Sequence, residues 1–496
     1  MADNKDSKPE IQEQALEGTT TVAPEVIVSE LAKQDKTPWY QKPNLRVLYF
    51  VIFPTCIGVE MTSGFDSSMM NGLQAVDSWD QFYNSPRSTL LGVMSAMYSA
   101  GAILALPFVP VITDGLGRRM AIVFGSIVMI IGAVIQTASQ NFAMFVVSRF
   151  ILGLGIPFAI VAASSLIGEL GHPKERAILG SLFNSCYFIG AIVAAGVTLG
   201  TFKMPSNWGW RIPSLLQVVP SSLQIIFIFW LPESPRWLIS KGRGDEAFDI
   251  LAKYHAEGDR ESEFVKAEYV QIEKTLELEK ETKKVGWFDL LKSPGMRRRV
   301  LIGSFLGLAT QWSGNGLTSY FLARILENVG VHDNHTKNLI NLANTCWGFL
   351  NATILALTVS RFKRRTMYLM RAREHLAPSL PFLVELFPFH VRAKGISIFQ
   401  WFGRMAGFFN QFVNPIGIEN AGWKYYISYC VFLAFEVCFV FFLFPETSGR
   451  SLEELAFLYE TEELKEQKKR VGNEIAHENI DEKVSDVVET DRTRAA

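Results

Sequence analysis

Long apolar runs alternate with short polar stretches along most of this chain. The apolar runs lie near 46–64, 88–112, 119–138, 142–167, 177–200, 213–231, 299–323, 338–359, 396–418 and 424–444. A helix of about 20 apolar residues spans a bilayer core, and it satisfies its own backbone groups there. Strands of a membrane barrel would alternate apolar and polar residues, which these runs do not. The pattern therefore predicts an all-α polytopic membrane protein.

The polar stretches divide the chain into five parts. They are a cytoplasmic tail at 1–44, a first half at 45–232, a linker at 233–298, a second half at 299–460 and a second tail at 461–496. The tails are polar and expected to be disordered, and 1–44 has no signal-peptide pattern. Within the linker, 241–283 mixes charged and apolar residues at helical spacing, which predicts amphipathic helices.

Composition narrows the function. Hydrophobic residues make up 49% and charged residues 20%, and the net charge of −1 gives no reason to expect nucleic acid as a partner. The histidines are scattered, and the five cysteines lie in apolar runs without a CxxC pair, so we predict no metal site. We find no catalytic motif or nucleotide loop, and we expect neither an enzyme nor a cofactor.

Basic residues predict the orientation. Lys and Arg gather in the connections 114–120, 171–177, 233–298 and 360–365. The positive-inside rule places these connections and both tails in the cytoplasm. The sequon at 334–336 then lies outside.

Several motifs point to one family. They are "DGLGRRM" at 114–120, "SRFILGLG" at 148–155, "GELGHPKERA" at 168–177, "PESPRWLISKGR" at 232–243, "QWSGNGLTSYF" at 311–321, "ELFPFHVRAKG" at 385–395 and "PETSGRSLEEL" at 445–455. Together they resemble the sugar porter branch of the major facilitator superfamily. The segments "GFDSSMMNGLQ" and "FFNQFVNPIG" are most similar to those of the fungal hexose and lactose permease-like members.

The resemblance implies a fold and a function. The fold is two six-helix halves, and the function is uptake of a mono- or disaccharide across the plasma membrane by proton symport and alternating access. The implied partners are the sugar, protons and the lipid bilayer, and the implied state is a monomer. A non-transporting sugar sensor, or an inert product of a faulty gene model, remain the alternatives.

Charged residues recur at the cytoplasmic ends of both halves, as expected of an internal repeat. By resemblance they form gating networks, and simple topology charges are the alternative. The residues are Asp114, Arg118, Arg119, Glu169, Arg176, Glu233, Arg236, Glu385, Arg392, Glu446 and Arg450.

Ionisable residues inside spans are expected to be functional. By resemblance, Asp66 carries the proton and Arg149 pairs with it, against the alternative of a capping residue at the span end. Glu60 is a second coupling candidate. Arg404 either lines a cavity or extends its stem to the nearby cytoplasmic surface, and we favour the second interpretation.

Amide side chains are the candidate sugar ligands, and helix–helix hydrogen bonding is the alternative for each. The candidates are Asn184, Gln311, Asn315, Asn344 or Asn351, Asn410, Gln411 and Asn414. Gln311 and Asn315 stand four residues apart, which predicts that they share a helix face.

Residues 360–395 depart from the family pattern. Between the basic "SRFKRR" and "VRAKG", only fourteen residues, 376–389, are mainly apolar, too few to cross once at about 1.5 Å per residue. By resemblance, roughly 50 residues are missing, which are span nine and most of span ten. Losing two crossings together preserves the topology of the rest.

Overall fold

The computed structural model describes residues 31, 35, 37–282, 288–358, 386–387 and 392–444, and its regular elements are helices. The first half contains η1 (Trp39–Gln41), α3 (Pro43–Ile52), η2 (Phe53–Ile57), α4 (Gly58–Leu73), α5 (Asp77–Phe82), α6 (Ser88–Ala105), η3 (Leu106–Phe108), α7 (Val109–Leu116), α8 (Arg118–Thr137), α9 (Phe142–Leu170), α10 (Arg176–Thr201), α11 (Trp208–Leu216) and α12 (Val218–Ile228). The linker holds α13 (Pro235–Ser240), α14 (Gly244–His255), α15 (Glu263–Thr282) and η4 (Phe288–Leu291). The second half contains α16 (Pro294–Trp312), α17 (Asn315–Asn328), α18 (Asn334–Thr358), α21 (Arg392–Ala421), η7 (Gly422–Lys424) and α22 (Tyr425–Leu443).

As far as the structure describes them, the expected apolar runs fold as single helices or as successive helices. Seven stretches of the described chain are long and apolar enough to cross a membrane, and one of them, Lys394–Leu443, holds most of α21 and all of α22. The expected runs 299–323 and 338–359 are helical but more polar, because α16 opens with arginines and α18 carries several asparagines. The first span, Pro43–Leu73, is longer than expected and contains a π-helical turn at Pro54.

Glycines set the spacing inside the first half. A Cβ on Gly153 of α9 would lie 1.8 Å from the Tyr98 carbonyl oxygen of α6, and a Cβ on Gly125 of α8 would lie 2.7 Å from the Gly155 oxygen. Small residues let helix backbones approach closely in membranes. The glycines of "SRFILGLG" therefore hold α6, α8 and α9 together.

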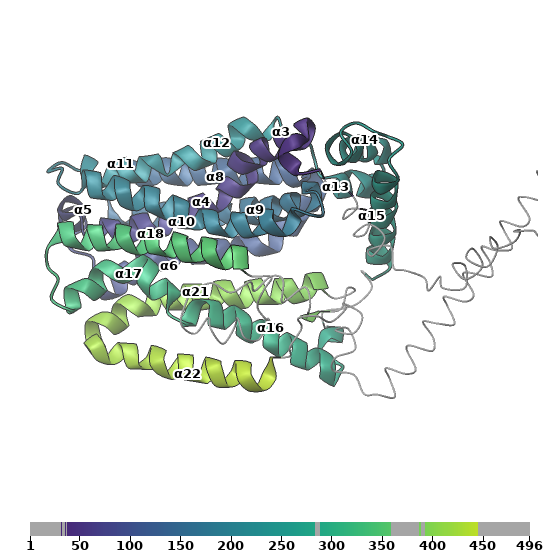
Figure 1. Ribbon diagram of the computed structural model, residues 1–496. Coiled ribbons are helices and arrows are strands. Elements are labelled where there is room, and N and C mark those ends of the chain that lie inside the picture. The colour runs from purple at the N-terminus through teal and green to yellow at the C-terminus, as the bar shows by residue number, and fades with distance from the viewer. Residues whose placement is uncertain are drawn as a thin grey trace, which may run out of the picture.

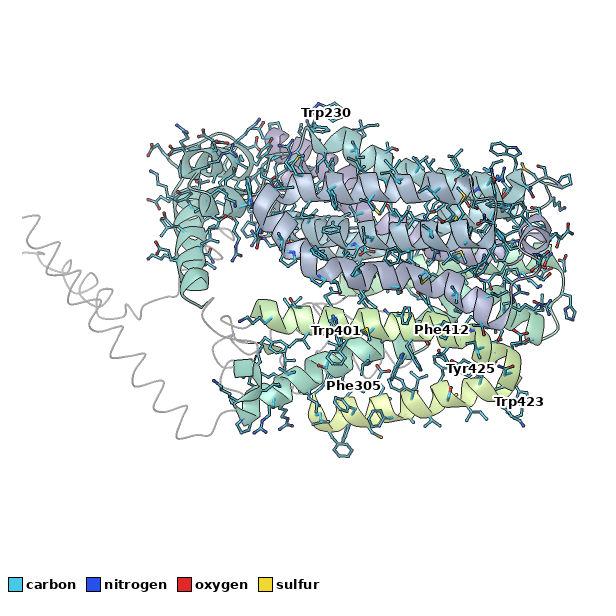
Figure 2. The ribbon with its side chains drawn as sticks, turned by 180° about the vertical axis from the view of Figure 1, so that it is seen from behind. Trp230, Phe305, Trp401, Phe412, Trp423 and Tyr425 are labelled. Atoms are coloured by element: carbon cyan, nitrogen blue, oxygen red, sulfur yellow. The ribbon has the colours of Figure 1, made fainter. Side chains whose placement is uncertain are left out.

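The two halves lie side by side with their helices roughly parallel (Figure 1). In that view α18 runs along α10, while α21 lies between α6 and the pair α16 and α22. Figure 2 labels Phe412 on α21, and the Phe412 carbonyl oxygen would lie 2.6 Å from a Cβ on Gly92 of α6. The linker helices α13, α14 and α15 gather at one end of the bundle (Figure 1).

The outside of the bundle is apolar. Exposed side chains include Phe50 at 73%, Val111 at 70%, Trp230 at 64% and Phe442 at 76%. Such a surface is typical of contact with lipid rather than water. It agrees with the predicted polytopic membrane protein.

One local prediction is wrong. Gln311 and Asn315 do not share a continuous helix, because α16 ends at Trp312 and α17 begins at Asn315. Gly314 between them has φ of +101°, a left-handed conformation that an α-helix cannot contain. The four-residue spacing therefore does not place the two side chains on one face.

Candidate functional site

A cavity of about 200 Å³, here called the central cavity, lies where the two halves meet. From the first half it is lined by Glu60, Ser63, Tyr98, Ser99, Ile160 and Tyr187. From the second half it is lined by Gln311, Gly316, Ser319, Tyr320, Gly403, Arg404, Gly407 and Gln411. Its volume lies below the roughly 300–1,000 Å³ of drug-sized pockets, and hydroxyl and amide groups dominate its wall. The cavity therefore suits a small polar ligand held by both halves.

The structure brings Asp66 and Arg149 together. The Arg149 guanidinium of α9 pairs with the Asp66 carboxylate of α4, and their side chains are 0% and 1% exposed. Gln217 donates to the same carboxylate oxygen at 2.7 Å, and Arg149 Nε donates to the Met94 carbonyl at 3.3 Å. Gln217 was not singled out from the sequence, although an amide inside an apolar span was a usable signal.

Tyr98 connects this pair to the central cavity. Its ring lies under the Arg149 guanidinium, 5.0 Å from ring centroid to Cζ, and the same side chain lines the cavity. Asp66 Oδ2 and Arg149 Nη2 remain without a hydrogen-bond partner although both are buried. Because these atoms lack partners, the stability of the buried ion pair depends on the charges and contacts around it.

The amide candidates occupy different places. Gln311 lines the central cavity. Asn410 is buried and donates to the Gln311 carbonyl at 2.9 Å while accepting from Tyr429 at 2.6 Å, so it supports the backbone at Gln311. Asn184 and Asn344 have exposed side chains outside the cavity lining, and Asn184 donates to the Gly180 carbonyl of its own helix. The Asn315 side chain lies outside the described part.

Among the other polar residues of this region, Gln411 is one of the candidates from the sequence and Asn341 is not. Gln411 lines the cavity and accepts from Ser99 at 2.7 Å across the two halves. Asn341, three residues before the candidate Asn344, accepts from Asn71 at 2.9 Å. Arg404 was expected to reach for the surface, but it lines the central cavity instead. Helix periodicity alone did not tell which side of each span faces the partner half.

Hydrogen bonds and ion pairs join the halves at the end opposite the linker helices. Asn71 accepts from the Ala323 amide at 2.9 Å, and Gln74 donates to the Tyr320 carbonyl at 2.6 Å. Arg324 pairs with Asp80 at 3.4 Å. We call these contacts the opposite-end seal, because they lie between the cavity and that end of the bundle.

The other end, here called the basic end, carries a charged network within the first half. Arg118 donates to both Glu169 carboxylate oxygens, at 3.2 and 3.3 Å, and pairs with Asp114 at 3.4 Å. The Glu233 carboxylate accepts from the backbone N–H groups of Arg118 and Arg119 at 3.1 and 3.2 Å, at the start of α8. Burial raises the pKa of Glu233, although these N–H groups oppose that shift.

Gly117 allows the turn before α8 to lie against the Glu233 carboxylate. Its φ is +95°, and a Cβ there would lie 2.5 Å from Glu233 Oε2. The motifs "DGLGRRM" and "PESPR" therefore pack directly against each other. Arg236 lies in the first turn of α13, half-buried.

Arg176 joins the bundle to the linker helices. It pairs with the buried Glu268 of α15 at 3.6 Å, and His255 of α14 contacts the same carboxylate at 2.7 Å. Although burial opposes its ionisation, His255 and Arg176 hold the pKa of Glu268 below its usual value. Of the expected second-half network, Glu385, Glu446 and Arg450 lie outside the described residues, as does the Arg392 side chain.

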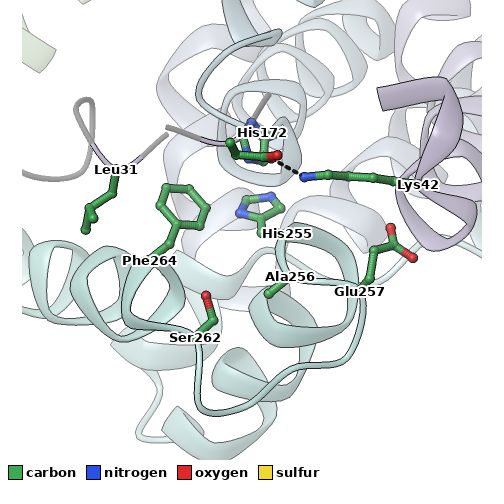
Figure 3. Close-up of a pocket in the computed structure, with 9 residues that line it drawn as sticks. Leu31, Lys42, His172, His255, Ala256, Glu257, Ser262 and Phe264 are labelled. Atoms are coloured by element: carbon green, nitrogen blue, oxygen red, sulfur yellow. Dashed lines mark hydrogen bonds and ion pairs between the residues drawn. The ribbon is translucent and has the colours of Figure 1, made fainter. Parts of the chain in front are cut away.

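A second cavity of about 250 Å³ lies where the linker helices meet the bundle (Figure 3). His172, His255 and Phe264 face one another there, and Lys42 donates to Asp35 at 2.5 Å. Burial, and then the charge of His255, lowers the pKa of His172 to about 3. Among the described residues, no group of three or more His, Cys, Asp or Glu side chains is placed to hold a metal ion.

The comparison with known families decides the classification. The chain matches the family described as "Sugar (and other) transporter" over residues 51–373 and 377–459. This chain belongs to that family. The predicted sugar porter resemblance is thereby confirmed, and the family is one of membrane transporters rather than enzymes.

Relatives of this sugar transporter family member span most of its length. The "High-affinity glucose transporter" of Kluyveromyces lactis is 26% identical over 479 residues, covering 84% of this chain and 86% of that protein. The "Arabinose-proton symporter" of Bacillus subtilis is 26% identical over 483 residues, covering 85% of this chain and 99% of that protein.

Solved structures confirm the major facilitator fold. The xylose transporter XylE from E. coli in its inward open conformation aligns with a TM-score of 0.65 at 21% identity, covering 83% of this chain and 100% of that chain. The proton:xylose symporter XylE bound to 6-bromo-6-deoxy-D-glucose aligns with a TM-score of 0.68 at 19% identity, covering 84% of this chain and 100% of that chain.

Proposed function

We propose that this transporter is built to import a sugar, a mono- or disaccharide, across the plasma membrane by alternating access. The observation that carries the proposal is the central cavity, which both halves line with hydroxyl and amide groups. Relatives named for glucose and arabinose support the ligand class. Gln311 and Gln411 are the amides placed to contact the sugar, and Asn410 positions Gln311.

The basic end faces the cytoplasm in this proposal, with both tails on that side. Arg118, Arg119 and Arg176 gather there, which supports the positive-inside orientation. The opposite-end seal then closes the cavity toward the outside. The transporter acts as a monomer in the lipid bilayer, and the networks of Arg118 and Arg176 hold one access state.

Asp66 couples transport to protons. When Asp66 takes up a proton, its attraction to Arg149 is lost. The freed Arg149 guanidinium then moves against Tyr98, which lines the cavity. Protonation of Asp66 thereby changes the contacts of Tyr98 at the sugar site. Binding of the proton and binding of the sugar can then each favour one access state.

The second half lacks span nine and most of span ten. The family match breaks between residues 373 and 377, within 360–395, where the sequence departs from the family pattern. The alignment with the Kluyveromyces protein runs over 479 positions but covers 84% of this 496-residue chain, about 417 residues, so roughly 60 positions lack a counterpart. That shortfall has the size of two spans with a connection. We expect such a chain to take up no sugar, because its second half cannot complete the cycle.

The test compares two chains in proteoliposomes. One is the chain as it stands, and the other has the two spans restored. The restored segment is taken from the spliced transcript across the codons for 360–390. Otherwise, two spans of the Kluyveromyces relative are inserted between 373 and 377. We expect uptake of labelled glucose or xylose, driven by an inward proton gradient, only in the second chain. Uptake by the chain as it stands would show that it completes the cycle without these spans, and uptake by neither chain would disprove the transport proposal.

A further inference from the structure

Two charged residues of the central cavity have no role in the proposal so far. Glu60 comes from α4 of the first half and Arg404 from α21 of the second, and both are half-buried in the cavity wall. Within the described chain, neither side chain has a hydrogen bond or an ion pair within 4.0 Å.

Charges held away from bulk water are costly unless they are compensated. The remaining cavity wall offers hydroxyls, amides and small residues without a formal charge. The carboxylate and the guanidinium therefore cancel each other, and the cavity as a whole is neutral. A neutral ligand keeps this balance, while a charged ligand brings a net charge into the cavity and meets one like charge.

The hydrogen-bonding capacities of Glu60 and Arg404 also favour a neutral ligand with hydroxyl groups. An ionised carboxylate only accepts hydrogen bonds and a guanidinium only donates them, whereas a hydroxyl does both. Neighbouring hydroxyls of a sugar can donate to Glu60 and accept from Arg404. Hydrogen bonds to charged groups are about twice as strong as neutral ones.

We propose that Glu60 and Arg404 bind neighbouring hydroxyls of one neutral sugar, one from each half of the transporter, and select against charged sugars. This inference rests on the proposed function and adds its specificity. The sugar then bridges α4 and α21, so its binding draws the halves together. Like-charge contacts supply the rejection of uronates by Glu60 and of amino sugars by Arg404.

The experiment measures binding rather than uptake, because binding does not require a complete cycle. The full chain is purified in nanodiscs, and labelled D-glucose is competed with D-glucose, D-glucuronate and D-glucosamine at a pH where the amine is protonated. For the wild type we expect glucose to compete best. Glu60→Gln should improve glucuronate relative to glucose about tenfold, and Arg404→Gln should do the same for glucosamine, since tenfold corresponds to about 1.4 kcal/mol.

The controls separate charge selection from general damage. Glu419→Gln and Lys424→Gln remove charges of the same signs at exposed positions, and the competition ratios should stay at the wild-type values. Arg404→Lys keeps the charge, so it should weaken glucose binding yet retain the rejection of glucosamine. Melting curves show that each variant is folded.

Unchanged ratios in Glu60→Gln and Arg404→Gln, with glucose still bound, would overturn this inference and leave the proposed function standing. A wild type that prefers glucuronate would also overturn it, because the cavity would then select an anion. A wild type that binds none of the three sugars would overturn the proposed function and the inference with it.

Discussion

At the scale of single residues, the Asp66–Arg149 pair stands out because both side chains are buried and each keeps an unsatisfied atom. Ionisable residues in spans were expected to be functional. The family resemblance gave the pairing itself, and the structure adds Gln217 and Tyr98 as its neighbours.

Asp66→Asn tests the proton proposal in a chain with the missing spans restored. We expect uptake to lose its dependence on the proton gradient, because the amide cannot be protonated at working pH. Removing one partner of a buried pair also destabilises by about 3–5 kcal/mol, so melting must be recorded beside uptake. Uptake of wild-type rate and wild-type proton dependence would exclude Asp66 as the carrier.

His172 predicts how acid affects the contact between linker helices and bundle. Its pKa is about 3 in the folded state and near 6.5 in an unfolded chain. The unfolded state therefore binds more protons between these values, and stability falls as pH drops below about 6.5. The loss amounts to at most about 1.4 kcal/mol per pH unit.

Hydrogen exchange of α14 and α15 between about pH 7 and 5 checks this prediction. We expect protection to decrease toward the acid side in the wild type. His172→Gln should flatten the slope, while the exposed His332→Gln should not change it. Equal slopes in all three proteins would contradict the assignment to His172.

At the scale of helices, close backbone contacts at glycine decide how the first half packs. Gly153→Ala places a Cβ within 1.8 Å of the Tyr98 oxygen, so α6 and α9 must separate. Overpacking of this kind costs roughly 1–3 kcal/mol. We expect a lower melting temperature, and a weaker effect of Asp66 on sugar binding, because Tyr98 shifts.

Gly168→Ala is the matched control on the same helix. A Cβ there meets nothing within 4 Å, and alanine is the better helix former. Its melting temperature should be unchanged or slightly raised. A Gly153→Ala protein as stable as the control would show that the two helices separate without cost.

At the scale of the whole molecule, the opposite-end seal decides from which side the central cavity opens. Asn71 is 1% exposed and bonds to both Asn341 and the Ala323 amide. Asn71→Ala leaves these groups unpaired, at a cost of about 1–3 kcal/mol. We expect the seal to loosen and the population open toward that end to rise.

Cysteine labelling measures that shift. The native cysteines are first replaced by serine, and Ser319→Cys then places one cysteine in the wall of the central cavity. A thiol reagent that cannot cross the membrane is added on the side that faces the opposite-end seal, and the rate of labelling is measured. Labelling should be faster with Asn71→Ala. Asn328→Ala removes a bond within the second half only, from Asn328 to the Ile418 carbonyl, and should leave the rate unchanged.

The sequence by itself determined the fold class and the family, and it proposed the division into two halves with a linker and the Asp66–Arg149 pair. The fold class follows from the length and apolarity of each run, while the family resemblance rests on motifs that are local in the chain and implies the Asp66–Arg149 pair. The sequence also located most helices, although it missed the extension of the first span to Leu73 and the break at Gly314.

Only the tertiary structure decided which side chains line the central cavity. Glu60, Gln411 and Arg404 face it, while Asn184 and Asn344 do not line it. A span that is apolar on nearly all sides carries little periodic signal, since lipid and protein neighbours are equally apolar. Which face meets the other half is fixed by packing between residues hundreds of positions apart, such as Ser99 with Gln411.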